Sequence, residues 1–422
     1  MPARASKPCL MAAARRSPRK RPLEYSILYT ATLCLLAAGA VMVYSASSAE
    51  SLLEGPGDAS FYLKRYLALG VVGLGVLHLS SRVSLKTVKN VTPLLLVSSF
   101  VLTIAVMLPG IGVTVNGATR WLTAGSLQFQ PSELLKLSLV LYAAQLLAAR
   151  PRSTQTIGGL MKPLLLVVGA ACLLLLKQPD MGTAMVICFA IGTLLIAAGV
   201  PVKKLGLILG VLAGLALLVA IVEPYRRARL TSFIDPWSDA GDTGFQAVQA
   251  LTAIGSGGLF GVGLGESVQK IFYLPEAHTD MILAIIGEEI GLVGIFGLIS
   301  LYGMIGYAGL RAAKNAVDRH AKLLAAGVTS LIMCQATLNF FAVLGMAPLT
   351  GVPLPFVSYG STNLIVLLGG MGLLLNVAAR PARSRRQPAS GDLRAIDGGG
   401  GDQDRDRRRR DGGTRRAGAG GR

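Results

Sequence analysis

Charged residues are scarce in this chain. Asp, Glu, Lys and Arg make up 15% of its 422 residues, whereas apolar residues make up 52%. An ordinary soluble domain is about 25% charged. Here the apolar residues come in long runs, and the mean hydropathy is +0.57. This composition excludes a soluble enzyme, a coiled coil and a disordered chain.

Cysteine and histidine are also rare, with five cysteines and three histidines in the whole chain. Four of the cysteines lie in apolar runs and one lies in a tail, and their spacing shows no pairs. The sequence therefore implies neither a disulfide framework nor a zinc site.

Acidic residues are fewer than basic ones, 22 against 41, which gives a formal net charge of +19. Two tails hold most of this excess, because residues 1–24 carry a net +6 and residues 381–422 another +6. A nucleic-acid-binding protein carries such charge on a folded face with aromatic residues. Here the basic tails flank an apolar body, so we expect them to bind anionic lipid and not nucleic acid.

The apolar runs predict an all-α polytopic membrane protein, because a membrane-spanning helix needs about 20 mostly apolar residues. Lys and Arg gather in alternate loops, and the positive-inside rule then places both termini in the cytoplasm. An even number of spans agrees with that placement. The ten predicted transmembrane helices are 25–45, 61–80, 91–109, 131–149, 163–177, 182–200, 204–222, 281–310, 322–346 and 359–379.

The predicted organisation has three parts. A basic cytoplasmic tail (1–24) precedes the ten-helix membrane domain (25–380), and a Gly/Arg-rich cytoplasmic tail (381–422) follows it. The last tail has almost no apolar side chains and is predicted to be disordered. One long external loop, about 223–280, joins the seventh and eighth spans, and its aromatic residues predict that it is partly structured.

A polar motif precedes the fourth predicted span at its outer end, from Gln130 to Lys136. Pro131 suits the first position of a helix. Glu133 and Lys136 are then three residues apart and share a helix face. They form either a charged pair that faces a substrate cavity, with Arg120 above it, or a structural ion pair between helices. The spacing leaves both interpretations open.

Asp180 lies in a tight turn between the fifth and sixth spans, where capping of the next helix is the simpler role. The long loop contains two further features. Its glycines between 255 and 265 do not form a nucleotide-binding loop, since no strand precedes them and the loop faces outside. The three arginines Arg226, Arg227 and Arg229 either hold an anionic headgroup or mark the outer interface.

Asp280 follows His278 where the long loop enters the eighth span. A carboxylate at a dry membrane edge has its charged form disfavoured, which suits a general base, and His278 is placed to tune it. At 100° per residue, Glu288 and Glu289 cannot both share the face of Asp280 on a regular helix. We expect Glu289 to contact a neighbouring helix.

Three prolines between 348 and 355 forbid a regular helix before the tenth span. Such backbone is tolerated at membrane depth only against protein or a watery cavity. We therefore expect the loop that ends at Ser358 and Tyr359 to dip toward the same cavity.

Taken together, these motifs resemble the SEDS family (shape, elongation, division and sporulation) of glycosyltransferases over roughly residues 25–380. The sequences of these motifs are most similar to those of division-type members, and an elongation-type member with the same chemistry is the close alternative. A lipid II flippase or other transporter is the alternative of a different class. No clear internal repeat is present and the polar motifs cluster on the outer side, which favours an enzyme. The most specific stretches are 130–133 with Lys136, 178–183, 274–280 and 353–360.

The resemblance implies a peptidoglycan glycosyltransferase that polymerises lipid II into β-1,4-linked glycan strands. The implied place of the reaction is the outer face of the bacterial cytoplasmic membrane, at the division septum. The implied partners are a class B penicillin-binding protein, which crosslinks the strands, and other membrane proteins of the division complex. The family's essential aspartate corresponds to Asp280, which takes the proton from the 4-hydroxyl of the acceptor sugar.

The leaving diphosphate needs cations, and Arg120 and Lys136 are the leading candidates. Family members commonly have two adjacent arginines before the tryptophan, whereas this chain has Thr119-Arg120-Trp121. Lys136 ranks ahead of Lys270 because we expect it inside the helix bundle. The sequence leaves open whether a divalent cation, Mg²⁺ or Mn²⁺, shares this role, and no other cofactor is implied. The expected substrate-binding residues are Arg120, Gln130, Glu133, Lys136, Asp180, His278 and Ser358.

Overall fold

The computed structural model describes residues 22–53, 57–115, 118–124, 127–151, 164–201, 203–206, 210, 214 and 232–380. In this part of the chain, seven helices are long and apolar enough to cross a membrane. They are α1 (Leu23–Leu53), α2 (Phe61–Arg82), α3 (Leu85–Ala105), α4 (Pro131–Ala149), α12 (Gly291–Asn315), α13 (Arg319–Val343) and α14 (Ser361–Ala378).

Two shorter apolar helices, α6 (Leu166–Lys177) and α7 (Met181–Ala197), coincide with the predicted fifth and sixth spans. The chain is thus a largely helical, multi-pass membrane protein. Most of the predicted seventh span (204–222) lies outside the described residues, and so do residues 223–231 of the long loop. Nearly all of the N-terminal tail and the whole of 381–422 lie outside them too.

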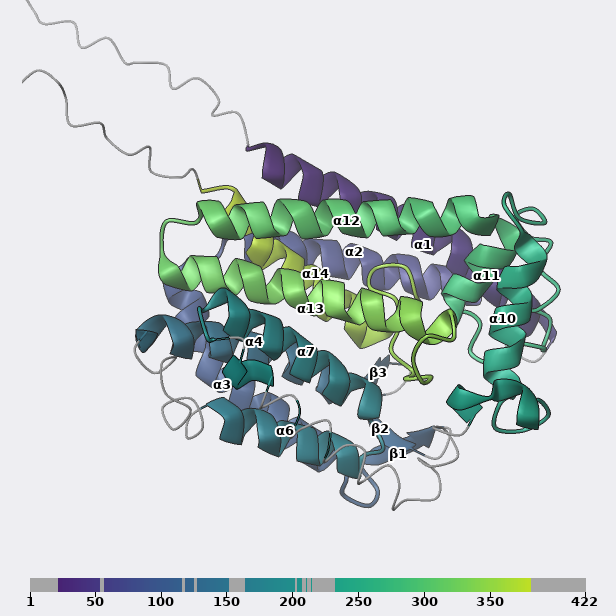
Figure 1. Ribbon diagram of the computed structural model, residues 1–422, viewed down its shortest axis with the longest axis horizontal. Helices are drawn as coiled ribbons and strands as arrows, with labels where there is room; N and C mark the ends of the chain where they lie inside the picture. Colours follow the sequence, from purple (N-terminus) through teal and green to yellow (C-terminus); the bar gives the residue numbers. More distant parts are fainter. Residues whose placement is uncertain are drawn as a thin grey trace, which may run out of the picture. The chain divides into compact units, whose positions relative to one another are not determined.

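Helix α13 lies at the centre of the bundle and packs against α4, α7, α12 and α14 (Figure 1). The most apolar windows of α13 and α14 are 78% and 83% buried, whereas those of α2 and α3 are only 17% and 22% buried. Polar side chains on α13 therefore face protein, while α2 and α3 present apolar surface for lipid. Figure 1 also shows that α1 begins and α14 ends at the same end of the bundle.

A small antiparallel sheet lies between α3 and α4, which corrects the all-α prediction. Its strands are β1 (Gly112–Val115), β2 (Ala118–Ala124) and β3 (Leu127–Phe129), in the order β1-β2-β3. Threonine, valine and tryptophan in β1 and β2 favour extended backbone, which explains the strands. Within β2, Trp121 pairs with Val113 and Leu122 pairs with Phe129. The sheet fixes the position of Arg120 in β2.

The predicted eighth span is two helices, α11 (Ile282–Glu289) and α12, which corrects the single helix of 281–310. The break falls at Gly291, whose φ of +75° is costly for residues with a Cβ. Segment 258–261 packs against the break, and the backbone N–H groups of Leu292 and Val293 donate to Gly258 and Leu259. The loop backbone thus caps the start of α12.

The described part of the long loop is structured, as predicted. It contains the short 3-10 helix η3 (Pro236–Asp239) and the helix α10 (Phe245–Gly257), which packs on α11. Asp235 caps η3 by accepting from the N–H of Trp237 at 3.2 Å. In Figure 1, α10 and α11 lie at the end of the bundle opposite the start of α1, and the sheet lies toward the same end.

Candidate active site

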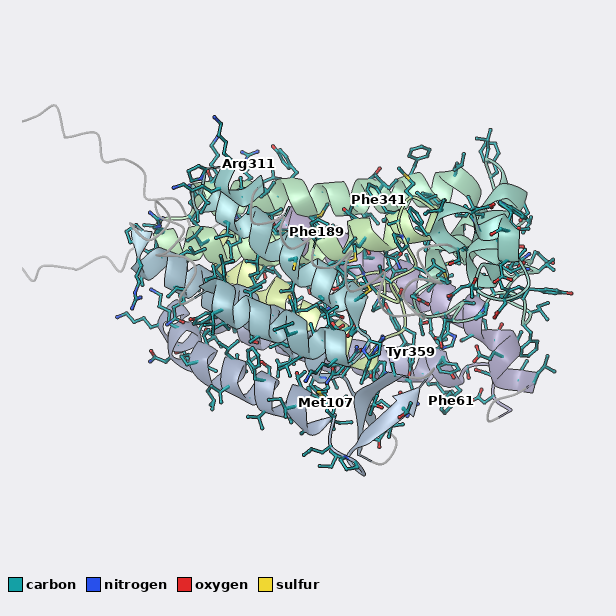
Figure 2. The ribbon with its side chains drawn as sticks, turned by 60° about the horizontal axis from the view of Figure 1, so that its bottom comes forward. Phe61, Met107, Phe189, Arg311, Phe341 and Tyr359 are labelled. Carbon is teal, nitrogen blue, oxygen red and sulfur yellow. The ribbon has the colours of Figure 1, made fainter. Side chains whose placement is uncertain are left out.

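A cavity of about 470 Å³ opens among α1, α2, the sheet, segment 276–280 and the loop before α14. Four of the predicted site residues line it: Arg120, Gln130, His278 and Asp280. Figure 2 shows Tyr359, another lining residue, near Phe61 at the start of α2, and Arg311 at the opposite end of the bundle. The cavity therefore lies at the end that the Lys/Arg distribution predicts to be external.

Asp280 is held at the cavity by its backbone. Its carbonyl oxygen accepts a hydrogen bond from Asn339 Nδ2 on α13 at 2.7 Å, and α11, in which every residue is buried, begins two residues later. A Cβ at Gly351 would lie 3.8 Å from Asp280 Oδ2. Glycine is favoured there because its φ is +65°, and it leaves the space beside the carboxylate open.

His278 lines the cavity among partners that are distant in sequence. Its Nδ1 lies 3.2 Å from Glu50 Oε2 at the end of α1. Its ring centroid lies 4.4 Å from that of Tyr62 and 5.7 Å from that of Tyr359. Burial raises the pKa of Tyr359, and the nearby guanidinium of Arg65 opposes that shift. Local motif reading missed Glu50, Tyr62 and Arg65, because only the fold brings α1 and α2 to this segment.

Arg120 lines the cavity and also fastens the turn before α7. Its guanidinium donates to the carbonyl of Gln178 at 3.0 Å and to that of Pro179, and it lies 4.0 Å from Asp180. Asp180 is buried and accepts from the N–H of Thr183 at 3.2 Å, so it caps α7. Asp180 is not among the described residues that line the cavity.

Glu133 and Lys136 form a buried ion pair at 2.9 Å, with side chains 2% and 1% exposed. Neither is among the described residues that line the cavity. Lys136 Nζ also donates to Gln335 Oε1 at 2.9 Å, and Gln335 Nε2 donates to the carbonyl of Pro353 at 2.9 Å. Pro353 does line the cavity. The pair therefore supports the loop between α13 and α14 (residues 344–360, the cavity loop) through one side chain of α13.

Ser358 has a local role in the same loop. Its hydroxyl accepts from the backbone N–H of Leu354 at 2.8 Å, and the residue is buried. It lies outside the set of described residues that line the cavity. This bond closes the turn that follows the prolines and so fixes the shape of the loop.

Lys270, the lower-ranked cation, is buried as well, at 8% exposed. Its Nζ lies 2.9 Å from Glu289 Oε1 and donates to Ser45 on α1 and to the carbonyl of Gly265. Glu289 accepts from the hydroxyl of Ser45 on α1 at 2.6 Å, so it contacts a neighbouring helix as expected. Glu288 accepts from Ser267 and from the N–H of Val268. Lys136 lies inside the helix bundle as expected, on α4 and in contact with α13, whereas Lys270 is buried in the loop before α11.

Other positive charge near the cavity could come from the arginines of the long loop or from a bound metal ion. The three arginines at 226, 227 and 229 lie outside the described residues. Among the residues that are described, no group of three or more His, Cys, Asp or Glu side chains is arranged to hold a metal ion. Of the described arginines, Arg65 and Arg120 line the cavity.

Comparison with known proteins supplies the family. A family described as cell cycle protein, which covers FtsW, RodA and SpoVE, matches residues 26–383. A probable peptidoglycan glycosyltransferase FtsW from Thioalkalivibrio sulfidiphilus is 43% identical over 87% of this chain and 91% of its own length. Stage V sporulation protein E of Bacillus subtilis is 37% identical over 83% of this chain and 96% of its own.

Solved structures agree with these sequence relatives. A peptidoglycan synthase complex, described as coordinating polymerization and crosslinking, contains a chain that matches with a TM-score of 0.69 and 30% identity. That match covers 83% of this chain and 96% of the other. The rod shape determining protein RodA of Thermus thermophilus matches with a TM-score of 0.61 and 29% identity, over 83% and 95%. The chain belongs to the FtsW, RodA and SpoVE family of cell cycle proteins, the SEDS family that its motifs resemble.

Proposed function

We propose that this protein is a peptidoglycan glycosyltransferase that polymerises lipid II, with Asp280 as its general base. The observation that carries the proposal is the position of Asp280 on a polar cavity that also contains Arg65 and Arg120. A base must lie within reach of the proton it removes, and Gly351 leaves room beside the carboxylate. The relatives named FtsW are described as probable peptidoglycan glycosyltransferases.

The chemistry requires one base and positive charge. Asp280 accepts the proton of the acceptor 4-hydroxyl while the hydroxyl oxygen attacks the anomeric carbon of the donor. The bond from that carbon to the lipid diphosphate breaks, and the diphosphate leaves with the bonding electron pair. Guanidinium groups bind phosphate oxygens in a bidentate manner. Arg65 and Arg120 are therefore assigned to the diphosphate, while Gln130 and His278 contact the sugars.

In this proposal the other predicted binding residues position the groups that line the cavity and do not contact the substrate. Glu133 and Lys136 support the cavity loop, Asp180 supports the turn that Arg120 fastens, and Ser358 shapes the loop before α14. They are positioning residues, since they are buried and are not among the described residues that line the cavity. Loss of any of them is expected to act through geometry and not through substrate contact.

Two observations support the predicted topology. The cavity and the basic residue Arg311 lie at opposite ends of the bundle (Figure 2), and the positive-inside rule puts the basic end in the cytoplasm. Helix α1 begins at the same end as α14 finishes, in accord with two cytoplasmic termini. The cavity then faces the outer leaflet of the cytoplasmic membrane, where a lipid-anchored substrate can enter.

We assign the protein to the division septum, with a class B penicillin-binding protein and other division-complex membrane proteins as partners. The FtsW relatives reach 43% identity, whereas the RodA structure is 29% identical. The related synthase complex couples polymerization to crosslinking, which supports a transpeptidase partner. Rescue of a division mutant, but not of an elongation mutant, tests the assignment.

The decisive experiment measures lipid II polymerisation by the purified protein, alone and with its class B partner. Wild type should form glycan strands, and Asp280→Asn should lose polymerisation while its expression and partner binding stay normal. An Asp280→Asn protein with normal activity would remove Asp280 as the base. Transfer of lipid II across liposome membranes without polymer would identify a flippase instead.

The same assay tests the assignment of charge to the arginines. The protein is treated with a chelator, and Mg²⁺ or Mn²⁺ is then added back. Activity that persists after chelation supports stabilisation of the diphosphate by Arg65 and Arg120. Activity that returns only with the ion shows that a divalent cation shares the role.

A further inference from the structure

Three aromatic rings meet on one side of the cavity and come from three separate segments. Tyr62 is in the first turn of α2, His278 precedes Asp280 by two residues, and Tyr359 precedes α14. The Tyr62 ring lies 4.4 Å from the His278 ring and 5.1 Å from the Tyr359 ring, between centroids. The two tyrosines are only partly buried, and all three residues line the cavity.

The rings are fixed in place by contacts that surround them. His278 Nδ1 lies 3.2 Å from Glu50 Oε2, within ion-pair distance. The backbone N–H of Tyr359 donates to the carbonyl of His278 at 3.0 Å, and the Arg65 side chain hydrogen-bonds to Tyr359. Rigid aromatic groups contribute contact area at little cost in side-chain entropy. The cluster is thus a preformed surface beside Asp280.

Two buried polar atoms at the same cavity have no hydrogen-bond partner among the described residues. Asn363 is 6% exposed and Thr350 is 8% exposed, and both line the cavity. Within the described part of the chain, Asn363 Nδ2 and Thr350 Oγ1 have no hydrogen-bond partner. Buried polar atoms are normally satisfied, so each unsatisfied atom needs an explanation. The amide side chains of Gln128 and Gln130 line the same cavity.

This combination fits a hexose. A pyranose ring has an apolar face of C–H groups, which packs on aromatic rings, and a rim of hydroxyl and amide groups, which bind side-chain amides and hydroxyls. Ligand sites commonly combine aromatic walls with a few convergent polar groups. A diphosphate needs cations and gains nothing from a tyrosine face. The aromatic side of the cavity therefore matches a sugar better than it matches the leaving group.

We propose that Tyr62, His278 and Tyr359 form an aromatic wall that binds the acceptor sugar, whose 4-hydroxyl attacks the donor. The proposal rests on the proposed function and deepens it. The wall adjoins Asp280 along the chain and in the cavity, so a sugar packed on it is the one that presents its hydroxyl to the base. Asn363 and Thr350 bind polar groups at the rim of that sugar.

The test compares ring removal with ring retention in the purified protein. Initial rates of polymerisation are measured against lipid II concentration for Tyr62→Leu, Tyr62→Phe, Tyr359→Leu and Tyr359→Phe. Both leucine variants should raise KM about tenfold with kcat little changed, because uniform binding is lost, and both phenylalanine variants should stay within about threefold of wild type. Tyr307→Leu is the matched control, since Tyr307 on α12 is exposed and is not one of the described cavity residues.

Thermal unfolding in detergent checks that each variant is folded, and Tyr62→Leu serves if Tyr359→Leu fails to fold. Wild-type KM in a folded leucine variant would overturn the wall. A phenylalanine variant as impaired as its leucine counterpart would also overturn it, because the hydroxyl and not the ring would then matter. A wild-type protein that makes no glycan contradicts the proposed function itself, and that result appears before any variant is compared.

Discussion

Two buried lysine–glutamate pairs in this protein have the same N···O distance but support different parts of it. Lys136 and Glu133 are 2.9 Å apart on α4, and Lys270 and Glu289 are 2.9 Å apart between the long loop and α11. Each lysine has one more side-chain partner. For Lys136 it is Gln335, which holds the cavity loop, and for Lys270 it is Ser45 on α1.

Burial and charge alone therefore do not identify a catalytic group. Both pairs are costly to bury, and neither lysine is among the described residues that line the cavity. The two pairs differ in the further residues that each lysine contacts. The Lys136 pair leads through Gln335 to Pro353 at the cavity, whereas the Lys270 pair ends on α1 and on the backbone of Gly265. The first is expected to affect catalysis, and the second to affect stability alone.

Among variants of the two pairs and their contacts, the largest effect on turnover is expected for Lys136→Met. Removing one partner of a buried ion pair costs about 3–5 kcal/mol of stability. The cavity loop also loses support, and a misplacement of about 1 Å can cost about 100-fold in rate. We expect such a loss per folded molecule in the polymerisation assay, with folding measured by thermal unfolding in detergent.

Lys270→Met is the matched control for that experiment. It removes the same charge from a pair of the same length, so its stability should fall by a similar amount. Its turnover per folded molecule should stay within about threefold of wild type, because the reacting groups keep their geometry. Equal loss of turnover in both variants would abolish the distinction between the two pairs.

A second large effect is expected for Asn339→Leu. Asn339 Nδ2 donates to the carbonyls of Asp280 and Val352, at 2.7 and 2.8 Å, and so joins the base to the loop that carries Gly351. Asn376 on α14 makes the same kind of contact, with the carbonyls of Ser80 and Val83. Each leucine variant removes two hydrogen bonds to backbone carbonyls, at about 0.5–1.5 kcal/mol for each bond.

The two asparagine variants should therefore unfold at similar temperatures but differ in turnover. We expect Asn339→Leu to lose about 30-fold in kcat, and Asn376→Leu to stay close to wild type, because only the first moves Asp280. Initial rates at saturating lipid II measure the difference. Similar kcat values for the two variants would show that Asn339 supports the fold without positioning the base.

A smaller effect is expected for Gln335→Glu. A carboxylate at this position still accepts from Lys136 but cannot donate to the carbonyl of Pro353. Loss of one hydrogen bond should lower kcat about fivefold, in keeping with a net value of about 1 kcal/mol. Gln335→Leu loses both contacts and should lie between Gln335→Glu and Lys136→Met. A wild-type rate for Gln335→Glu would show that the contact with Pro353 does not matter.

Local spacing predicted several parts of the site. The three-residue spacing of Glu133 and Lys136 gave their pairing, and the turn before α7 gave the capping role of Asp180. The position of Asp280 at the entry to a helix also followed from sequence. These features depend on residues that are near one another in the chain, where helix geometry is decisive.

Long-range contacts escaped the sequence because they depend on packing. Ser45 and Lys270 are 225 residues apart, and Lys136 and Gln335 are 199 apart. The break at Gly291 was missed because its cause is the approach of loop 258–261 and not a local signal such as proline. The sheet was missed because its strands are three to seven residues long inside a chain that is otherwise apolar and helical.

The smallest effect is expected for Ser45→Ala, which tests the second pair as Gln335→Leu tests the first. The Ser45 hydroxyl lies 2.6 Å from Glu289 Oε1 and 3.2 Å from Lys270 Nζ, so its removal takes away the third member of that cluster. Stability should fall by about 1.5–3 kcal/mol, the value of a hydrogen bond to a charged group. Turnover and KM should be unchanged, since no partner of the cluster among the described residues lines the cavity. If Ser45→Ala lowers turnover without lowering stability, the Lys270 pair also positions the cavity. The contacts of the two pairs would then not distinguish a pair that supports catalysis from one that supports only the fold.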